Sequence, residues 1–199
     1  MINFWNERYR EKVFLYGKEP NEFLAQQLQK IQTGKILFPC EEEGRNAVYT
    51  TKLGWDTFAF DLSKEGFKKT KLLAKHNQVE LNYQIADAIM VDYPTESFDS
   101  VALIFAHFPP TIRQSIHQKI INWLNLGGIL ILEAFNQLQL NNASGGPTDL
   151  NRLYTEEIIK EDFKPLKTEL LVSSQLILNE GKYHQGKADI IRYVGIKDY

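Results

Sequence analysis

Two aspartates follow apolar segments of the chain, where they could meet a bound small molecule. Asp61 comes directly after "WDTFAF", and Asp87 follows "LNYQIA". Asp61 lies seventeen positions after Gly44, close to the spacing of roughly 20 residues at which an acidic side chain binds ribose hydroxyls in nucleotide-binding folds. This spacing predicts that Asp61 binds a nucleoside. The alternative is that Asp61 only caps a helix beside Ser63.

The segment "FPCEEEGRNAV" (38–48) joins an apolar strand to a helix through a turn with three glutamates and one glycine. A dinucleotide needs a glycine-rich turn there, so that its pyrophosphate can approach backbone N–H groups. Carboxylates at 41–43 would repel that pyrophosphate, but they would tolerate or attract a cationic ligand. The turn therefore argues against a nicotinamide dinucleotide and permits a ligand with positive charge.

The segment "FAHFPP" (105–110) contains one titratable side chain, His107. The ordinary pKa of a histidine is near neutrality, so His107 is a candidate general base. A structural histidine that is bonded to backbone atoms is the alternative. We expect His76 and His117 to lie on helix surfaces, because their neighbours in the sequence are polar. No cluster of His, Cys and carboxylate residues suggests a metal site.

Strands and helices alternate along the sequence and must position these residues. Apolar runs predict strands, and Ser63 and Pro110 stand where helices begin. "LGG" (126–128) is expected to break the chain before a buried strand, and the segment 168–197 is expected to form a terminal hairpin. The order predicts a mostly parallel sheet with helices on both faces. The expected strands are 35–38, 55–60, 81–86, 100–106 and 129–135, and the expected helices are 45–53, 64–77 and 110–124.

Composition limits the class of protein. The chain has 199 residues, of which 43% are hydrophobic and 24% are charged, and this favours one globular domain over 1–199. The net charge of −2, with dispersed basic residues, disfavours nucleic acid as a partner. A single cysteine, Cys40, together with the lack of a long apolar run, predicts a cytoplasmic protein without a membrane segment.

The motifs taken together resemble a known family, the class I S-adenosylmethionine-dependent methyltransferases. "FWNERY…YGKEPNEFL", "EGRNAV", "HFPP", "LEAF…GGP…LYT" and "EGKYHQG" are similar to small bacterial methyltransferases related to tellurite-resistance and thiopurine methyltransferases. The resemblance covers nearly the whole chain. It implies a Rossmann-like α/β fold, with a seven-stranded, mostly parallel sheet whose last strand is antiparallel. It also implies S-adenosylmethionine as methyl donor, S-adenosylhomocysteine as product and a small-molecule acceptor such as a thiol or a chalcogen oxyanion.

The resemblance also implies roles for particular segments and residues. An N-terminal helical lid (1–30) would close over a cofactor-binding core (35–135), and residues 136–199 would form the acceptor side. Asp87 would accept a hydrogen bond from the adenine amine. The implied cofactor-binding residues are Trp5, Tyr9, Tyr16, Pro39, Glu41, Gly44, Arg45, Asn46, Asp61, Leu62, Asp87, Ala88, Phe105 and Ala106. The implied substrate-binding residues are Phe108, Phe135, Gln139 and His184.

The sequence departs from the family pattern at three positions. Cys40 and Glu42 stand where the family usually has glycines, which puts the fit of the cofactor in doubt. Phe108 precedes Pro-Pro where amine methyltransferases have Asp or Asn, so methylation of nucleic-acid amines is disfavoured. A catalytically silent nucleoside-binding protein is the main alternative, and a methyltransferase acting on protein or nucleic acid is a weaker one. The acceptor, and the choice between monomer and homodimer, stay open.

Overall fold

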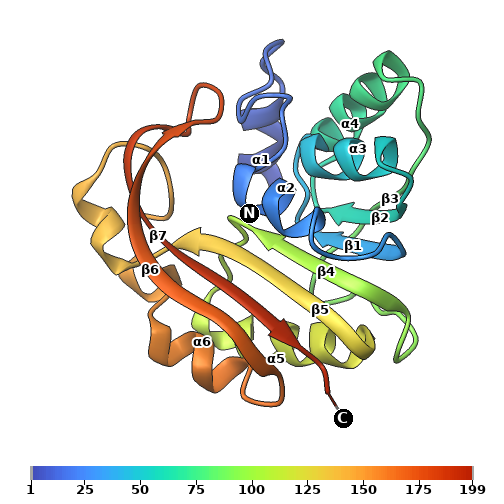
Figure 1. Cartoon of the computed structure of the whole chain (residues 1–199). Coiled ribbons are helices and arrows are strands. Elements are labelled where there is room, and N and C mark those ends of the chain that lie inside the picture. Colours follow the sequence, from blue (N-terminus) through green and yellow to red (C-terminus); the bar gives the residue numbers. More distant parts are fainter. Residues whose placement is uncertain (1, 199) are drawn as a thin grey trace.

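The computed structural model describes residues 2–198 as a twisted seven-stranded sheet between two layers of helices (Figure 1). The strand order is β3-β2-β1-β4-β5-β7-β6. Neighbouring strands from β1 to β5 pair in parallel, and β7 pairs antiparallel with both β5 and β6. The predicted fold class is confirmed, including the antiparallel last strand.

The elements agree closely with the predicted order. The strands are β1 (Lys35–Pro39), β2 (Asp56–Asp61), β3 (Asn82–Ile85), β4 (Phe98–Ile104), β5 (Leu124–Phe135), β6 (Lys167–Asn179) and β7 (Gln185–Ile196). The α-helices are α1 (Ile2–Tyr9), α2 (Glu22–Leu28), α3 (Arg45–Lys52), α4 (Lys64–His76), α5 (Pro110–Trp123) and α6 (Glu156–Asp162). Two short 3₁₀ helices, η1 (Gln137–Asn141) and η2 (Leu150–Arg152), lie between β5 and α6.

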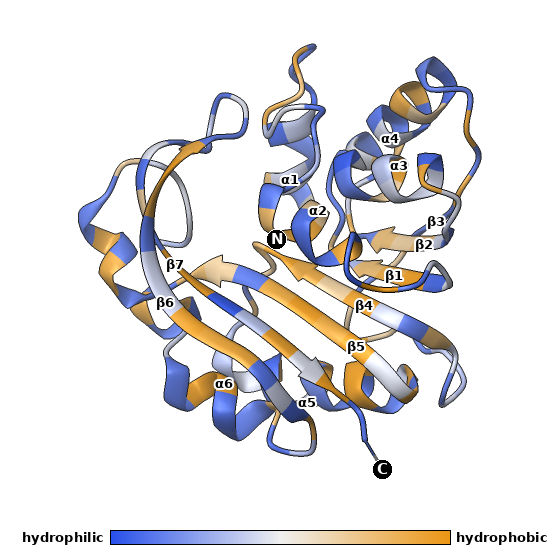
Figure 2. Cartoon of the chain, viewed as in Figure 1, coloured by the Kyte–Doolittle hydropathy of each residue, from blue (hydrophilic) through white to orange (hydrophobic). Residues whose placement is uncertain are grey.

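Each face of the sheet buries its own apolar cluster. On one face, β4 and β5 pack against α5 and α6 through residues such as Leu103, Ile120 and Phe163. On the other face, Phe38 of β1 packs with Phe23 of α2 and with residues of α3. Apolar residues dominate β4 and β5, whereas polar and apolar residues alternate on the covering helices (Figure 2). Strands that are covered on both faces can be apolar throughout, which explains why these runs were recognisable in the sequence.

Local sequence signals set several helix starts. The Ser63 side chain accepts a hydrogen bond from the backbone N–H of Gly66 and caps α4, as predicted. Pro110 occupies the first turn of α5, where its missing N–H costs nothing. Asn21 caps α2 by accepting from the backbone N–H of Leu24. These caps fix where the chain leaves the carboxyl edge of the sheet and enters each helix.

One detail of the predicted elements was wrong. The strand expected at 129–135 begins earlier, at Leu124, because a register shift against β4 lets "LGG" continue the strand. In α4, the apolar residue Leu72 is 63% exposed. The buried residues of this helix are Gly66, Lys69, Thr70, Leu73 and Ala74. Single apolar residues on a surface are common.

The prediction that His117 lies at the surface was also wrong. His117 is fully buried beneath α6, with its Nδ1 2.9 Å from Asp162 Oδ2 and its Nε2 3.2 Å from the Tyr154 hydroxyl. The Asp162 carboxylate also accepts from Arg113. Its polar neighbours in sequence point elsewhere, because residues adjacent in a helix lie on different faces. His76 is exposed, as predicted.

The segment between α1 and α2 contacts the turn of the β6–β7 hairpin. We call residues 10–21, between α1 and α2, the strap. The β6–β7 hairpin curls toward α1 (Figure 1), and the backbone N–H of Tyr183 donates to the carbonyl of Leu15 at 3.2 Å. Gly17 and Gly181 touch so closely that a Cβ on Gly181 would lie 2.3 Å from the Gly17 nitrogen. Among residues 2–198, no helix is long and apolar enough to span a bilayer.

Candidate functional site

Asp61 lies at the carboxyl end of β2 and binds the turn that follows β1. Its carboxylate accepts from the backbone N–H of Glu42 at 3.2 Å and from that of Ser63 at 2.8 Å. Burial raises the pKa of Asp61 to about 6, although these N–H groups act in the opposite direction. Each carboxylate oxygen has further acceptor capacity, so the backbone role of Asp61 and a ligand-binding role are compatible.

The turn after β1 (residues 40–44) has the backbone of a glycine-rich loop. Cys40 and Glu42, the positions where the resembling family has glycines, both have φ of 58°. This left-handed region is strained for residues with a side chain. Gly44 has φ of 88°, and a Cβ there would lie within 2.4 Å of Thr70 on α4, so this position accepts only glycine. Cys40 and Glu42 therefore adopt a backbone conformation that glycine favours.

Glu41 holds the first turn of α3. Its Oε1 accepts from the backbone N–H groups of Asn46 and Ala47, both at 2.8 Å, and the side chain is 5% exposed. Free N–H groups at a helix start bind anions well, and here the chain's own carboxylate takes that place. Burial raises the pKa of Glu41 to about 7 despite these donors. The start of α3 is thus closed to a phosphate, in agreement with the exclusion of a dinucleotide.

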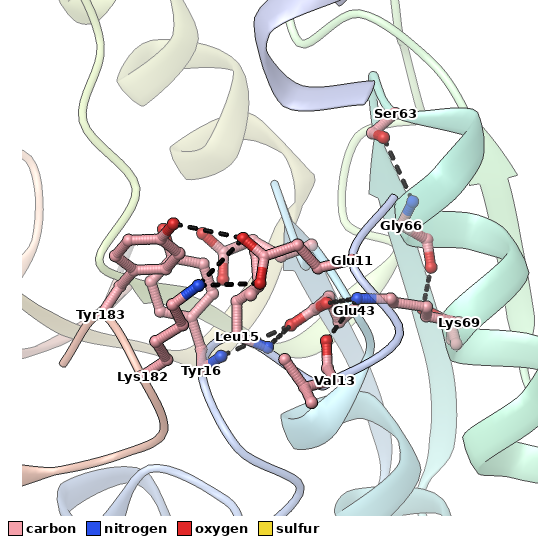
Figure 3. A network of polar contacts seen from close by, with 12 residues as sticks. Glu11, Val13, Leu15, Tyr16, Glu43, Ser63, Gly66, Lys69, Lys182 and Tyr183 are labelled. Atoms are coloured by element: carbon pink, nitrogen blue, oxygen red, sulfur yellow. Dashed lines mark hydrogen bonds and ion pairs between the residues drawn. The ribbon is translucent and has the colours of Figure 1, made fainter. Parts of the chain in front are cut away.

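Glu43 binds both α4 and the strap (Figure 3). Its Oε2 accepts from the backbone N–H of Leu15 at 2.7 Å, and its Oε1 lies 2.5 Å from Lys69 Nζ. Lys69 also donates to the carbonyl of Val13 at 2.7 Å. Both side chains of the Glu43–Lys69 pair are at most 9% exposed. The loop, α4 and the strap therefore form one connected polar unit.

A small cavity lies between the strap and the loop. Its volume is about 10 Å³, which is room for about one water molecule. It is bounded by the strap, the loop and the end of β4. The lining residues are Tyr16, Gly17, Cys40, Glu41, Glu42, Glu43, Arg45, Asn46, Ile104 and Phe105. Five of these (Tyr16, Glu41, Arg45, Asn46 and Phe105) are among the residues expected to bind cofactor.

The other residues expected to bind cofactor are not among those that line this cavity. Pro39 ends β1, Leu62 follows Asp61, and the buried Ala106 carbonyl accepts from Tyr154. Trp5 stacks on Tyr9 in α1, with ring centroids 5.5 Å apart. The backbone N–H of Ala86 donates to the Asp61 carbonyl, so Asp87 and Ala88 leave β3 beside Asp61. Asp87 also accepts from the backbone N–H of Ile89 at 2.9 Å.

His107 is bonded on both ring nitrogens to backbone atoms. Its Nδ1 lies 2.9 Å from the carbonyl of Arg152, and its Nε2 accepts from the backbone N–H of Phe135 at 3.3 Å. Burial lowers the pKa of His107 to about 4. This arrangement matches the structural alternative for His107 and leaves neither nitrogen free for a substrate.

The residues expected to bind substrate are divided between an aromatic cluster and the protein interior. His184 packs against the rings of Tyr16, Phe105 and Phe135, with centroids 4.6, 4.5 and 5.4 Å away. Its buried Nδ1 has no hydrogen-bond partner among residues 2–198. Phe108 lies in the core beside His117. The Gln139 amide bonds Ser144, the Gly145 carbonyl and the Asp189 N–H, so it organises the loop after β5.

A second cavity of about 260 Å³ lies between residues 16–22, at the end of the strap and the start of α2, and residues 176–181, at the end of β6. Charged side chains on its wall form a network that the sequence did not reveal. Asn21 donates to Glu133 at 2.6 Å and to Glu180 at 3.1 Å. Arg192 binds Glu133, and Arg45 binds Glu180 at 2.8 Å. Burial would raise the pKa of Glu180, but His184 and Arg45 hold it at about 2.

Comparisons with known proteins identify a similar domain and a shared fold. Residues 40–132 match the family model described as a methyltransferase domain. No curated protein matched the chain. Three solved structures cover most of it. The first structure comes from work on the conversion of a disulfide bond into a thioacetal group during echinomycin biosynthesis. It is 15% identical to this chain, with a TM-score of 0.80. The alignment covers 100% of this chain and 92% of that chain.

The second is TehB from Haemophilus influenzae, at 15% identity and a TM-score of 0.72, with coverage of 98% of this chain and 66% of TehB. The third is a SAM-dependent methyltransferase from Methanosarcina mazei, at 15% identity and a TM-score of 0.70, with coverage of 86% and 96%. At these identities the similarity is one of fold. The chain therefore has the Rossmann-like fold of the class I methyltransferases.

Proposed function

We propose that the protein is an S-adenosylmethionine-dependent methyltransferase that acts on a small molecule. One observation carries this proposal: the carboxyl edge of the sheet brings together Asp61, Asp87 and the acidic loop 40–44. Ligands of open α/β sheets bind at this edge. Carboxylates there suit a nucleoside that carries a sulfonium and an ammonium, because both groups are cationic.

The chemistry of the site suits this cofactor, but the volume requires one movement. Asp61 would hold the ribose, Asp87 the adenine amine, and the space beside Tyr16 and Phe105 would take the methionine part. A cavity of about 10 Å³ is too small for that part while the Glu42 side chain lies in it. Glu42 has three rotatable bonds and a partly exposed side chain. Rotation of Glu42 would make room without any change in the fold.

The acceptor is best matched by a soft nucleophile. S-adenosylmethionine supplies an electrophilic methyl group, and alignment of donor and acceptor provides much of the rate. A thiolate or a reduced selenium or tellurium species needs little help from a base. This agrees with His107, whose two nitrogens are already bonded to backbone. The rings of Tyr16, Phe105, Phe135 and His184 would give such an acceptor an apolar wall.

Calorimetric titration with S-adenosylmethionine and S-adenosylhomocysteine tests this proposal. We expect saturable heats with both ligands, and turnover with at least one acceptor among thiols, selenite, tellurite and phenols. The absence of heat and of any thermal shift at millimolar ligand would contradict the cofactor assignment. Turnover is measured by formation of S-adenosylhomocysteine, which does not depend on knowing the methylated product.

Replacement of Asp61 by alanine should weaken binding of the cofactor by about 1–3 kcal/mol, because charge-assisted hydrogen bonds to the ribose are lost. Calorimetry gives the affinity, and the thermal midpoint separates this loss from loosening of the loop. Asp56→Ala, at the exposed start of the same strand, is the matched control and should bind normally. An unchanged affinity in Asp61→Ala would leave Asp61 with a backbone role only.

A catalytically silent nucleoside-binding protein is the second candidate. The observation that favours it is the small volume of the cavity beside Glu42, about 10 Å³, which leaves little room for a methyl donor. Binding of both adenosyl ligands without turnover of any tested acceptor would support this candidate. Turnover by the wild-type protein would exclude it.

A further inference from the structure

Glu42 differs from its two glutamate neighbours because its carboxylate has no hydrogen-bond partner. Glu41 caps α3, and Glu43 binds Lys69 and the strap. Among residues 2–198, no hydrogen bond or ion pair reaches the Glu42 carboxylate, although Glu42 lines the cavity beside Tyr16 and Phe105. The Glu42 side chain is partly exposed, and its carboxylate remains available to a ligand. A cationic group of a bound ligand would give it a partner.

Glu42 also occupies a strained backbone position that glycine would relieve. Its φ of 58° lies in the left-handed region, and such strain typically costs about 1–3 kcal/mol and gathers at functional sites. The Asp61 carboxylate and the Tyr83 hydroxyl hold this conformation by bonding the N–H and the carbonyl of Glu42. The loop thus presents a glutamate side chain to the cavity at an energetic cost that glycine would avoid.

The charges around the cavity favour a cation. Arg45 is the one basic side chain among the lining residues, and its two terminal nitrogens already bind the Tyr16 carbonyl and Glu180. Lys69, the next cation, is paired with Glu43. Burial raises the pKa of Glu42, and the nearby Asp61 and Glu43 raise it further, while Arg45 opposes them. A ligand that brings positive charge would relieve this repulsion.

We propose that the Glu42 carboxylate is the counter-ion of the sulfonium, so that the site binds S-adenosylmethionine more tightly than its neutral thioether product. This inference rests on the proposed function and adds the charge selectivity of that site. The two ligands differ only in the methyl group and in the charge on sulfur. Transfer of the methyl group removes this charge from beside Glu42, so the product loses an attraction that the donor had. The same step would thereby promote release of S-adenosylhomocysteine.

Calorimetry on the full-length chain can test this selectivity with three probes: S-adenosylmethionine, S-adenosylhomocysteine and 5′-methylthioadenosine, a neutral thioether without the amino-acid tail. We expect wild-type protein to prefer S-adenosylmethionine over S-adenosylhomocysteine by at least about tenfold. Glu42→Gln keeps the size of the side chain and removes its charge. The variant should bring the ratio close to one, mainly by weakening S-adenosylmethionine. Glu161→Gln, exposed on α6, is the control and should keep the wild-type ratio.

Several outcomes would overturn the inference. The same ratio in wild type and Glu42→Gln would show that the charge is not used. Equal tightening of both ligands in Glu42→Gly would show that Glu42 only obstructs the cavity. Tighter binding of 5′-methylthioadenosine than of S-adenosylmethionine would show that Glu42 excludes the amino-acid tail. If wild type and both Glu42 variants bind none of the three ligands, the proposed function fails too; equal binding of donor and product by wild type defeats the selectivity alone.

Discussion

Replacement of Glu43 by alanine should lower the free energy of unfolding by about 3–5 kcal/mol, which is the range for removal of one partner from a buried ion pair. The Glu43 carboxylate is 2% exposed and lies 2.5 Å from Lys69 Nζ. Its loss leaves the Lys69 charge in a buried position, with the Val13 carbonyl as its remaining hydrogen-bond partner. It also leaves the Leu15 N–H without an acceptor. Urea denaturation followed by circular dichroism measures the change.

Two further variants keep this prediction testable if Glu43→Ala does not fold. Glu43→Gln keeps an acceptor for Leu15 and should lose less stability. The double variant Glu43→Ala/Lys69→Met removes both charges and should be more stable than Glu43→Ala alone, which a double-mutant cycle quantifies. Glu161→Ala breaks the exposed pair with Lys164 and should remain within error of wild type. A loss below about 1 kcal/mol in Glu43→Ala would mean that the strap is held by other contacts.

The free energy of unfolding of Asp61→Asn, relative to that of wild type, should rise by about 2.5 kcal/mol between pH 4 and pH 7 in the absence of ligand. The folded-state pKa of Asp61 is raised to about 6 by burial, from an ordinary value of 3.8. A raised pKa means that the carboxyl contributes stability in full below pH 3.8 and loses this contribution as the pH rises through about 6. At about 1.4 kcal/mol per pKa unit, the shift accounts for the size of the effect.

Chemical denaturation at one-unit pH intervals gives this difference directly. The comparison with a variant is needed because burial also lowers the pKa of His107, His117 and His184, which affects the stability of both proteins equally. Asp56→Asn, at the exposed start of β2, should follow wild type at every pH. A difference between Asp61→Asn and wild type that does not change with pH would contradict a raised pKa for Asp61.

The fold was predictable because its signals are local and repeated. Continuous apolar runs marked β1, β4 and β5, and caps such as Ser63 and Pro110 marked helix starts. The error at His117 arose where the tertiary environment decides. His117 lies on a helix, and only the packing of α5 against its neighbours determines which side this residue faces.

The sequence indicated which segments come together at the candidate site, but not their contacts. The spacing of Asp61 and the acidic loop pointed to the carboxyl edge of the sheet, and five of the residues expected to bind cofactor line the small cavity there. The partners of Glu43, Glu133 and Glu180 come from segments up to 159 residues away in the chain. No pattern within one segment reports such a pair, because the topology creates it. The ligand-binding roles assigned to individual residues stay predictions for the experiments above.

The contact between the strap and the β6–β7 hairpin has a consequence for the order of assembly. The Tyr183 backbone N–H donates to the Leu15 carbonyl, and Lys182 pairs with Glu11. These contacts join the strap to a hairpin that lies about 170 residues later in the sequence. Contacts between such distant segments form late, since the intervening chain must first be ordered. During synthesis from the N-terminus, β1 to β5 can collapse while the strap still lacks its partner. A nascent chain would therefore gain its ligand site only when the hairpin arrives, and cofactor binding would report completed folding.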